Sequence, residues 1–250
     1  MARIALILVA VAVLAASCAG DDEDGGGELE GLTVFAAASL TEVLEELAPE
    51  ATFSFAGSNE LAAQIREGAP ADVFASASPR YPDELRAEGL VDTPVAFATN
   101  RLVLVVPPDN PAGIESIDDL GAEGVKLVVG GEGVPAGDYA RGVLEQLGKA
   151  DVLDNVVSNE ADVKGVLGKV VAGEADAGFV YATDAVAAGD GVETIELPAQ
   201  PLVEYAVAPV IASPNFDAAQ AFIELLLSDA GREALEAAGF RVPEATPPSG

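Results

Sequence analysis

A serine that follows directly after an apolar segment could bind an anion. In the stretch VFAAASLTE the apolar residues end at Ser39, and Glu42 follows three positions later. This S-x-x-E spacing predicts a capping box, in which the serine oxygen accepts a backbone N–H at a helix start and the glutamate reaches back. A serine that accepts in this way keeps its own proton, which it can donate outward. We therefore expect Ser39 to cap a helix and to be a candidate donor to an anion.

Two further helix starts carry similar groups. Either Ser58 or Asn59 opens a helix directly after the apolar segment ATFSFAG. Pro135, which suits a first helical turn, is followed by Ala136. The start of a helix attracts anions, because its N–H groups are unpaired and carry a partial positive charge.

Two more candidates lie at the ends of predicted elements. The stretch SNEADVKGVL predicts a helix that opens near Val163, whose apolar side chain leaves its backbone N–H available. The strand AGFVY ends at Tyr181, in the position where ligands of open α/β sheets gather. Hydroxyl and amide donors at such ends indicate a site for an anion.

These groups need a framework of strands and helices. Helical patterns, such as residues 60–68 and 162–173, alternate with short apolar segments. This alternation predicts an α/β fold with helices flanking mixed or mostly parallel sheets. The predicted strands are 32–38, 51–57, 71–77, 101–107, 125–130, 177–181 and 203–211.

The composition excludes several kinds of function. With 12 Lys and Arg against 42 Asp and Glu, the formal net charge is −30, which would repel the phosphates of a nucleic acid. The chain has no histidine and a single cysteine, so it lacks Ser-His-Asp and Cys-His machinery and most zinc sites. We therefore expect neither nucleic-acid binding nor catalysis.

The N-terminal segment resembles a secretion signal. Residues 1–17 combine Arg3 with a short apolar run and small residues before Cys18, as a signal peptide does. The motif LAASC further resembles the bacterial lipobox, in which the cysteine is acylated and becomes the mature N-terminus. Residues 18–30 are acidic and rich in glycine, which is typical of a solvated tether. The alternative is ordinary signal cleavage without a lipid.

The basic residues indicate a division of the chain. All four lysines lie in the middle of the sequence, between residues 126 and 169. We predict one lobe made of residues 31–98 with 206–250 and a second made of residues 99–205.

Together the motifs resemble one family, the periplasmic molybdate-binding proteins, which are solute receptors of molybdate ABC importers. The resemblance runs from about Leu32 to the last helices. Five motifs carry it, in the order of the family: VFAAASL, GAPADVFASA, VPAGDYA, EADVKGVL and GFVYATDA.

The resemblance implies a two-lobed, type II periplasmic-binding fold that closes over its ligand. It also selects Ser58 over Asn59 and implies that the protein needs no cofactor, works as a monomer and delivers its ligand to a permease with a cytoplasmic ATPase. The implied location is outside the cytoplasm, either periplasmic or held by the lipid on Cys18 to the outer face of the membrane. The implied ligands of the oxyanion, without direct coordination of the metal, are the hydroxyls of Ser39, Ser58 and Tyr181 and the N–H groups of Ser39, Ser58, Ala136 and Val163.

A pocket that offers only hydrogen-bond donors suits molybdate and tungstate. Both are fully deprotonated at neutral pH, so their oxygens only accept hydrogen bonds. A protonated phosphate would leave its O–H unpaired in such a pocket, at a cost of about 1–3 kcal/mol. Sulfate also only accepts, so a receptor for sulfate or thiosulfate is the nearest alternative.

Other functions would each need a feature that the chain lacks or carries only in part. Gly131, Gly133 and Ala136 fit a G-x-G-x-x-A nucleotide fingerprint, but Pro135 interrupts it. A hydrolase would need a serine paired with Lys164, an organic-solute receptor would need more aromatic residues, and a structural adhesion module would bind no ligand. The 42 acidic residues could bind calcium, but they do not follow the spacing of an EF-hand loop.

Overall fold

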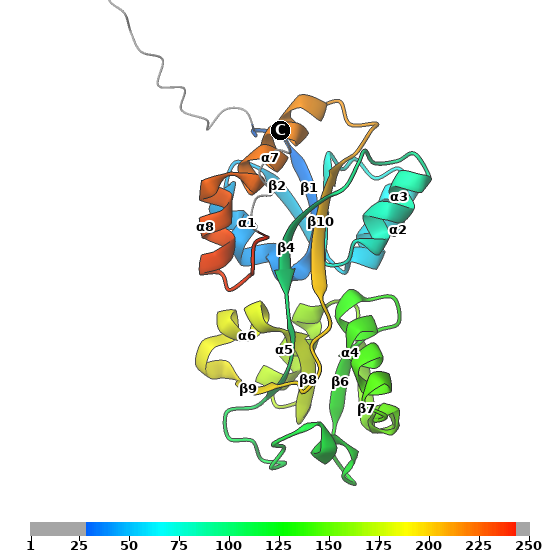
Figure 1. The fold of residues 1–250 in the computed structure, drawn as a ribbon, viewed down its shortest axis with the longest axis vertical. Helices are drawn as coiled ribbons and strands as arrows, with labels where there is room; N and C mark the ends of the chain where they lie inside the picture. The colour runs from blue at the N-terminus through cyan, green and yellow to red at the C-terminus, as the bar shows by residue number, and fades with distance from the viewer. Residues whose placement is uncertain (1–28, 244–250) are drawn as a thin grey trace, which may run out of the picture.

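The protein consists of two α/β lobes, each built on one five-stranded sheet (Figure 1). The structure, a computed structural model, describes residues 29–243. We call the lobes first and second, in the order in which the chain enters them. The predicted signal peptide, Cys18 and all but the last two residues of the predicted tether lie outside the described residues. Within residues 29–243, no helix combines the length and hydrophobicity that crossing a membrane requires.

The sheet of the first lobe is mixed. Its strand order is β2, β1, β3, β10, β4. β1 pairs in parallel with β2 and β3, whereas β10 runs antiparallel to β3 and β4. The strands span Thr33–Ala37 (β1), Thr52–Ala56 (β2), Val73–Ser76 (β3), Val95–Asn100 (β4) and Val203–Pro209 (β10).

The sheet of the second lobe is mixed in the same way. Its order is β7, β6, β8, β5, β9, with β6 parallel to β7 and β8, and β5 antiparallel to β8 and β9. The predicted fold class is therefore confirmed. The strands span Leu102–Val106 (β5), Leu127–Gly130 (β6), Val156–Glu160 (β7), Ala177–Tyr181 (β8) and Glu193–Glu196 (β9).

Helices cover both faces of each sheet. In the first lobe, α1, α7 and α8 lie on one side of the sheet and α2 and α3 on the other (Figure 1). The second lobe contains α4, α5 and α6. The helices span Thr41–Leu47 (α1), Ser58–Arg66 (α2), Arg80–Ala87 (α3), Pro135–Gln146 (α4), Val163–Val171 (α5), Ala182–Ala188 (α6), Phe216–Leu227 (α7) and Asp229–Ala237 (α8), with short 3-10 turns at Ala38–Leu40, Ile117–Gly121, Ala150–Asn155 and Gly189–Gly191.

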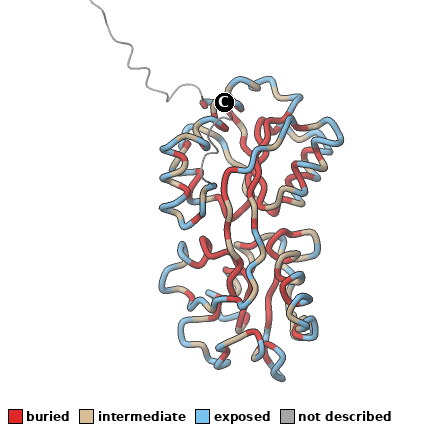
Figure 2. Tube along the Cα trace, in the orientation of Figure 1, coloured by how far each residue is buried: buried red, intermediate tan, exposed pale blue. Residues whose placement is uncertain are grey.

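The central strands are continuously apolar because both of their faces are buried. On β1, Val34 and Ala36 belong to the main apolar cluster, whereas Phe35 faces a second cluster that contains Leu61 of α2 and Leu85 of α3. Such two-sided burial is typical of parallel strands between helix layers. Figure 2 shows the buried residues concentrated along the strands of both lobes.

Two strands connect the lobes. β4 and β10 pair side by side, and Asn100 lies opposite Val203. The chain passes from the first sheet to the second between Asn100 and Leu102, and β10 brings it back. The predicted lobe boundaries, after residues 98 and 205, fall within these two strands, and the division stays a prediction.

Of the ten strands within residues 29–243, seven coincide with predicted segments and three do not. β4, β7 and β9 carry polar residues such as Asn100, Ser158 and Glu193 and include half-buried or exposed positions. β7 and β9 lie at the edges of their sheet. An edge strand has little apolar surface to bury, so its sequence lacks the apolar run by which the other strands are recognised.

Candidate functional site

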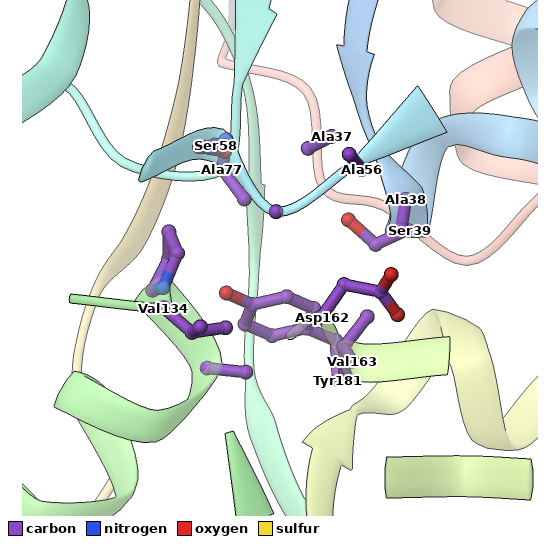
Figure 3. A pocket seen from close by; sticks show the side chains of 13 residues that line it. Ala37, Ala38, Ser39, Ala56, Ser58, Ala77, Val134, Asp162, Val163 and Tyr181 are labelled. Atoms are coloured by element: carbon purple, nitrogen blue, oxygen red, sulfur yellow. Dashed lines mark hydrogen bonds between the residues drawn. The ribbon is translucent and has the colours of Figure 1, made fainter. Parts of the chain in front are cut away.

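All five predicted ligand residues line one pocket between the lobes (Figure 3). Ser39 and Ser58 come from the first lobe, and Ala136, Val163 and Tyr181 from the second. The pocket has about 220 Å³ of empty volume, its mouth included. Each of the five residues is at most 5% exposed, and they come from both lobes. The lobes are therefore closed in this structure.

Ser39 does not cap a helix as the sequence predicted. It lies in the 3-10 turn Ala38–Leu40, and the N-cap of α1 is Leu40, which makes no side-chain capping bond. The Ser39 Oγ atom instead lies 2.8 Å from the hydroxyl oxygen of Tyr205. Glu42 binds Lys164 of the second lobe. The capping-box prediction is wrong because the tight turn moves the serine off the start of α1 and towards a distant strand.

Ser58 is the first residue of α2 and keeps a proton for the pocket. Its Oγ accepts a hydrogen bond from the backbone N–H of Ala77, at 3.1 Å. The N-cap residue Gly57 makes no side-chain capping bond, so the N–H groups of the first turn are not capped. Ser58 therefore offers an O–H and an N–H in the same place.

Gly57 allows the lobes to approach each other at Ser58. A Cβ atom on this glycine would lie 2.4 Å from the backbone oxygen of Ala161, which belongs to the second lobe. The φ and ψ angles of Gly57 are −61° and 137°, which any residue can adopt. Glycine is thus required here by the neighbouring lobe, and its own backbone is unstrained.

Ala136 lies in the first turn of α4, directly after Pro135 at the first helical position, as predicted. The N-cap residue Val134 makes no side-chain capping bond. A Cβ on Gly137 would lie 2.2 Å from the backbone oxygen of Gly130, so the small residue lets the helix start sit against the end of β6. The first turn of α4 therefore lines the pocket, through Pro135 and Ala136.

Val163 begins α5, again as predicted. Its N-cap residue Asp162 accepts only the N–H of Gly165, at 2.9 Å. The N–H of Val163 precedes that bonded group and has no acceptor within the helix. Asp162 is the only carboxylate among the lining residues, and its engagement at the cap leaves the pocket dominated by donors.

Tyr181 ends β8 and places its ring in the floor of the pocket (Figure 3). The residue is 1% exposed, and its hydroxyl oxygen has no hydrogen-bond partner among the described residues. Burial raises the pKa of this phenol well above its usual value, so the group stays protonated. A buried hydroxyl without a partner is costly, and it is a donor available to a ligand.

Contacts outside the pocket also join the two lobes. The Nζ atom of Lys164 in α5 lies 2.7 Å from Oε1 of Glu42 in α1. On another side, the Tyr81 hydroxyl of α3 donates to the backbone oxygen of Gly133, and Arg80 lies 3.7 Å from Asp138. These contacts depend on the closed arrangement of the lobes.

Lys164 also faces a buried acid. Asp184, in the first turn of α6, is fully buried, and its Oδ1 atom lies 3.5 Å from the Lys164 Nζ atom. Its Oδ2 atom accepts the backbone N–H of Tyr181 at 3.2 Å. Burial, partly offset by Lys164, raises the pKa of Asp184 to about 6. The Lys164 ammonium thus lies between two carboxylates, one from each lobe.

Tyr205 and the second role of Lys164 were not predicted from the sequence. Tyr205 lies in β10 and reaches Ser39 across 166 positions of sequence. The residues around it predicted only a strand, and no local signal marked the hydroxyl. Lys164 was considered only as a hydrolase base, whereas it pairs with acids of both lobes.

A closed pocket of donors between two α/β lobes joined by two strands defines a two-lobed ligand-binding protein. Comparison with known proteins agrees with this class. Residues 32–241 match the family model described as bacterial extracellular solute-binding protein, and the chain belongs to this family.

Three individual proteins are similar to this chain over most of their length. The chain is 37% identical over 224 residues to the molybdate-binding protein ModA of Mycobacterium tuberculosis, covering 85% of each chain. It is 35% identical over 261 residues to ModA of Escherichia coli, covering 97% of this chain and all of the other. The fold matches the periplasmic molybdate-binding protein of Azotobacter vinelandii with a TM-score of 0.76 and 23% identity, over 85% of this chain and 100% of that one. The resemblance inferred from the five motifs is confirmed.

Proposed function

We propose that this protein captures molybdate or tungstate between its lobes, outside the cytoplasm, and delivers the anion to an ABC importer. The observation that carries the proposal is the Tyr181 hydroxyl, which is buried in the pocket without a partner among the described residues. Around it lie the uncapped first turns of α2 and α4 and the Val163 N–H at the start of α5. An anion that accepts from all of these groups would remove the cost of leaving them unpaired.

The donor set suits a fully deprotonated oxyanion. In the proposed complex the hydroxyls of Ser39, Ser58 and Tyr181 and the N–H groups of Ser39, Ser58, Ala136 and Val163 bind the oxygens. Each helix start adds roughly half a positive charge, so no arginine or lysine is needed in the pocket. The acidic surface acts weakly on an enclosed site, because salt screens charges beyond about 8 Å.

Sulfate is the second candidate, because it is also a tetrahedral acceptor. Molybdate is favoured by the relatives at 35–37% identity, which are named molybdate-binding proteins and match over most of their length. Phosphate fits less well, since its protonated oxygen would meet donors only.

The proposal extends to the partners of the receptor, its attachment to the membrane and the division into lobes. Its partners would be a permease and a cytoplasmic ATPase, and it would act as a monomer without cofactor or catalysis. A lipid on Cys18 would hold it to the outer face of the membrane through the tether of residues 18–30. Its lobes would be residues 31–98 with 206–250, and residues 99–205.

Thermal unfolding of residues 29–250 with added anions tests the proposal. At about 100 times its dissociation constant a ligand adds roughly 2.7 kcal/mol to the free energy of unfolding. We expect this from molybdate and tungstate, not from phosphate, and not in a Ser39→Ala/Ser58→Ala variant. Ser54→Ala, a change in β2 outside the pocket, is the matched control. Equal stabilisation by sulfate would indicate a general oxyanion receptor, and no response to any anion would refute the proposal.

A further inference from the structure

A chain of buried polar side chains lies behind Ser39. The Tyr205 hydroxyl oxygen is 2.8 Å from the Ser39 Oγ atom and 3.5 Å from the Nδ2 atom of Asn100. Asn100 also donates from Nδ2 to the Oγ1 atom of Thr183, at 2.9 Å. All four residues are at most 7% exposed. Asn100 and Tyr205 lie in β4 and β10, and Ser39 follows β1 of the same sheet, so their arrangement does not depend on closure.

The orientation of the Asn100 amide is fixed by the backbone. Its Oδ1 atom accepts the N–H of Arg101 at 2.9 Å. A flipped amide would place two donors against each other at this point. The NH2 group must therefore face Thr183 and Tyr205, and Asn100 can only donate to them.

This orientation decides where the hydroxyl protons lie. Because Tyr205 accepts from Asn100, its one proton is available to Ser39. Burial raises the pKa of the Tyr205 phenol well above its usual value, so that proton is retained. In the reverse arrangement, with Ser39 donating to Tyr205, the buried Tyr205 proton would have no acceptor among these neighbours. Ser39 is left with its own proton, and it lines the pocket.

We propose that Tyr205 is a positioning residue that makes Ser39 an obligate donor and thereby favours a fully deprotonated oxyanion over a protonated one. This inference rests on the proposed function of the same site. Without Tyr205, the Ser39 Oγ atom could also accept a hydrogen bond, and a protonated anion would find the acceptor that it now lacks.

Tyr205→Phe is a clean probe of this role. The ring is fully buried and packs edge-on against Phe97, Tyr181 and Phe240, with centroids 6.1, 5.9 and 5.2 Å away. Phenylalanine keeps these contacts and removes only the hydroxyl. The free energy of unfolding without ligand, measured in denaturant, shows whether the variant folds normally.

The test is a double-mutant cycle on molybdate affinity, measured by titration calorimetry with wild type, Tyr205→Phe, Ser39→Ala and the double variant. We expect Tyr205→Phe to weaken binding about tenfold, and to change it less than twofold when Ser39 is already alanine. The ratio of molybdate affinity to hydrogen-phosphate affinity should also fall in Tyr205→Phe. Asn100→Ala, one step further from the pocket, should cause a smaller loss that again depends on Ser39.

Each outcome is decisive. Wild-type affinity in Tyr205→Phe, or an equal loss with and without Ser39, would overturn this inference and leave the proposed function intact. Weaker molybdate binding with an unchanged ratio of molybdate affinity to hydrogen-phosphate affinity would indicate that Tyr205 only packs. That result would also overturn the inference. Failure of wild type to bind any of molybdate, tungstate and sulfate would overturn the proposed function, and the inference with it.

Discussion

The ion pair between Lys164 and Glu42 spans the cleft beside the pocket. Lys164 directly follows Val163 in α5, and its Nζ atom lies 2.7 Å from the carboxylate of Glu42 in the first lobe. The pair can therefore exist only when the lobes are closed. Closure of the pocket therefore coincides with the formation of an ion pair at the surface.

Loss of this pair should weaken ligand binding modestly. The Glu42 side chain is 56% exposed and that of Lys164 is 27% exposed, and ion pairs of this kind contribute about 0.2–1 kcal/mol. We expect Glu42→Gln to weaken molybdate binding about two- to fivefold at about 0.1 M salt and hardly at all at about 1 M. Glu45→Gln is the control, since Glu45 lies in the same helix and forms no ion pair among the described residues. An equal effect at both salt concentrations would contradict an electrostatic role.

Closure of the lobes should fail in Gly57→Ala. The new Cβ atom would lie 2.4 Å from the Ala161 backbone oxygen of the other lobe, while the backbone of Gly57 tolerates alanine. We expect an unchanged free energy of unfolding without ligand and a loss of molybdate affinity of about 100-fold or more. Gly142→Ala is the control, since that Cβ would meet nothing within 4 Å. Calorimetric binding and chemical unfolding measure the two quantities, and tight binding by Gly57→Ala would disprove the assignment.

Tyr181→Phe should separate binding from stability. The Tyr181 hydroxyl has no partner among the described residues, so its removal takes away a donor to the ligand and no bond within this part of the protein. We expect at least tenfold weaker molybdate binding and a ligand-free protein that is no less stable than wild type. Unfolding in denaturant, with and without molybdate, measures both effects. A variant that is destabilised without ligand would show that the hydroxyl has a structural partner.

Asp184 should make stability depend on pH. Its pKa rises from 3.8 to about 6 on folding, so the folded protein binds this proton more tightly than the unfolded chain. The resulting stabilisation is present below about pH 4 and is lost as pH rises through about 6. Between about pH 4 and pH 7 the free energy of unfolding should fall, relative to Asp184→Asn, by up to about 3 kcal/mol. Parallel pH curves for the two proteins would contradict the raised pKa.

The sequence predicted best those features that are encoded locally. Pro135 suits a first helical turn, the helical pattern of residues 162–173 marks the helix that begins at Val163, and Tyr181 ends an unbroken apolar strand. The family motifs then placed these residues in one site. Their common pocket agrees with that placement, while the role of each as a ligand stays a proposal.

Features that depend on distant partners could not be predicted from the sequence. Ser39 matched a capping box, yet its partner is Tyr205, and its position follows from the 3-10 turn at Ala38–Leu40. The Lys164 and Glu42 pair joins positions 122 residues apart. The edge strands β7 and β9 bury little apolar surface, so they left no run of apolar residues to find.

Anion binding between the lobes is tested most directly by a crystal of this protein grown with tungstate and measured at a tungsten absorption edge. The anomalous map locates the metal independently of any assumption about the ligand. We predict one strong peak between the lobes, with the tungstate oxygens within hydrogen-bonding distance of Ser39, Ser58, Ala136, Val163 and Tyr181. A pocket without a tungsten peak, or tungsten bound only elsewhere, would contradict the proposed function.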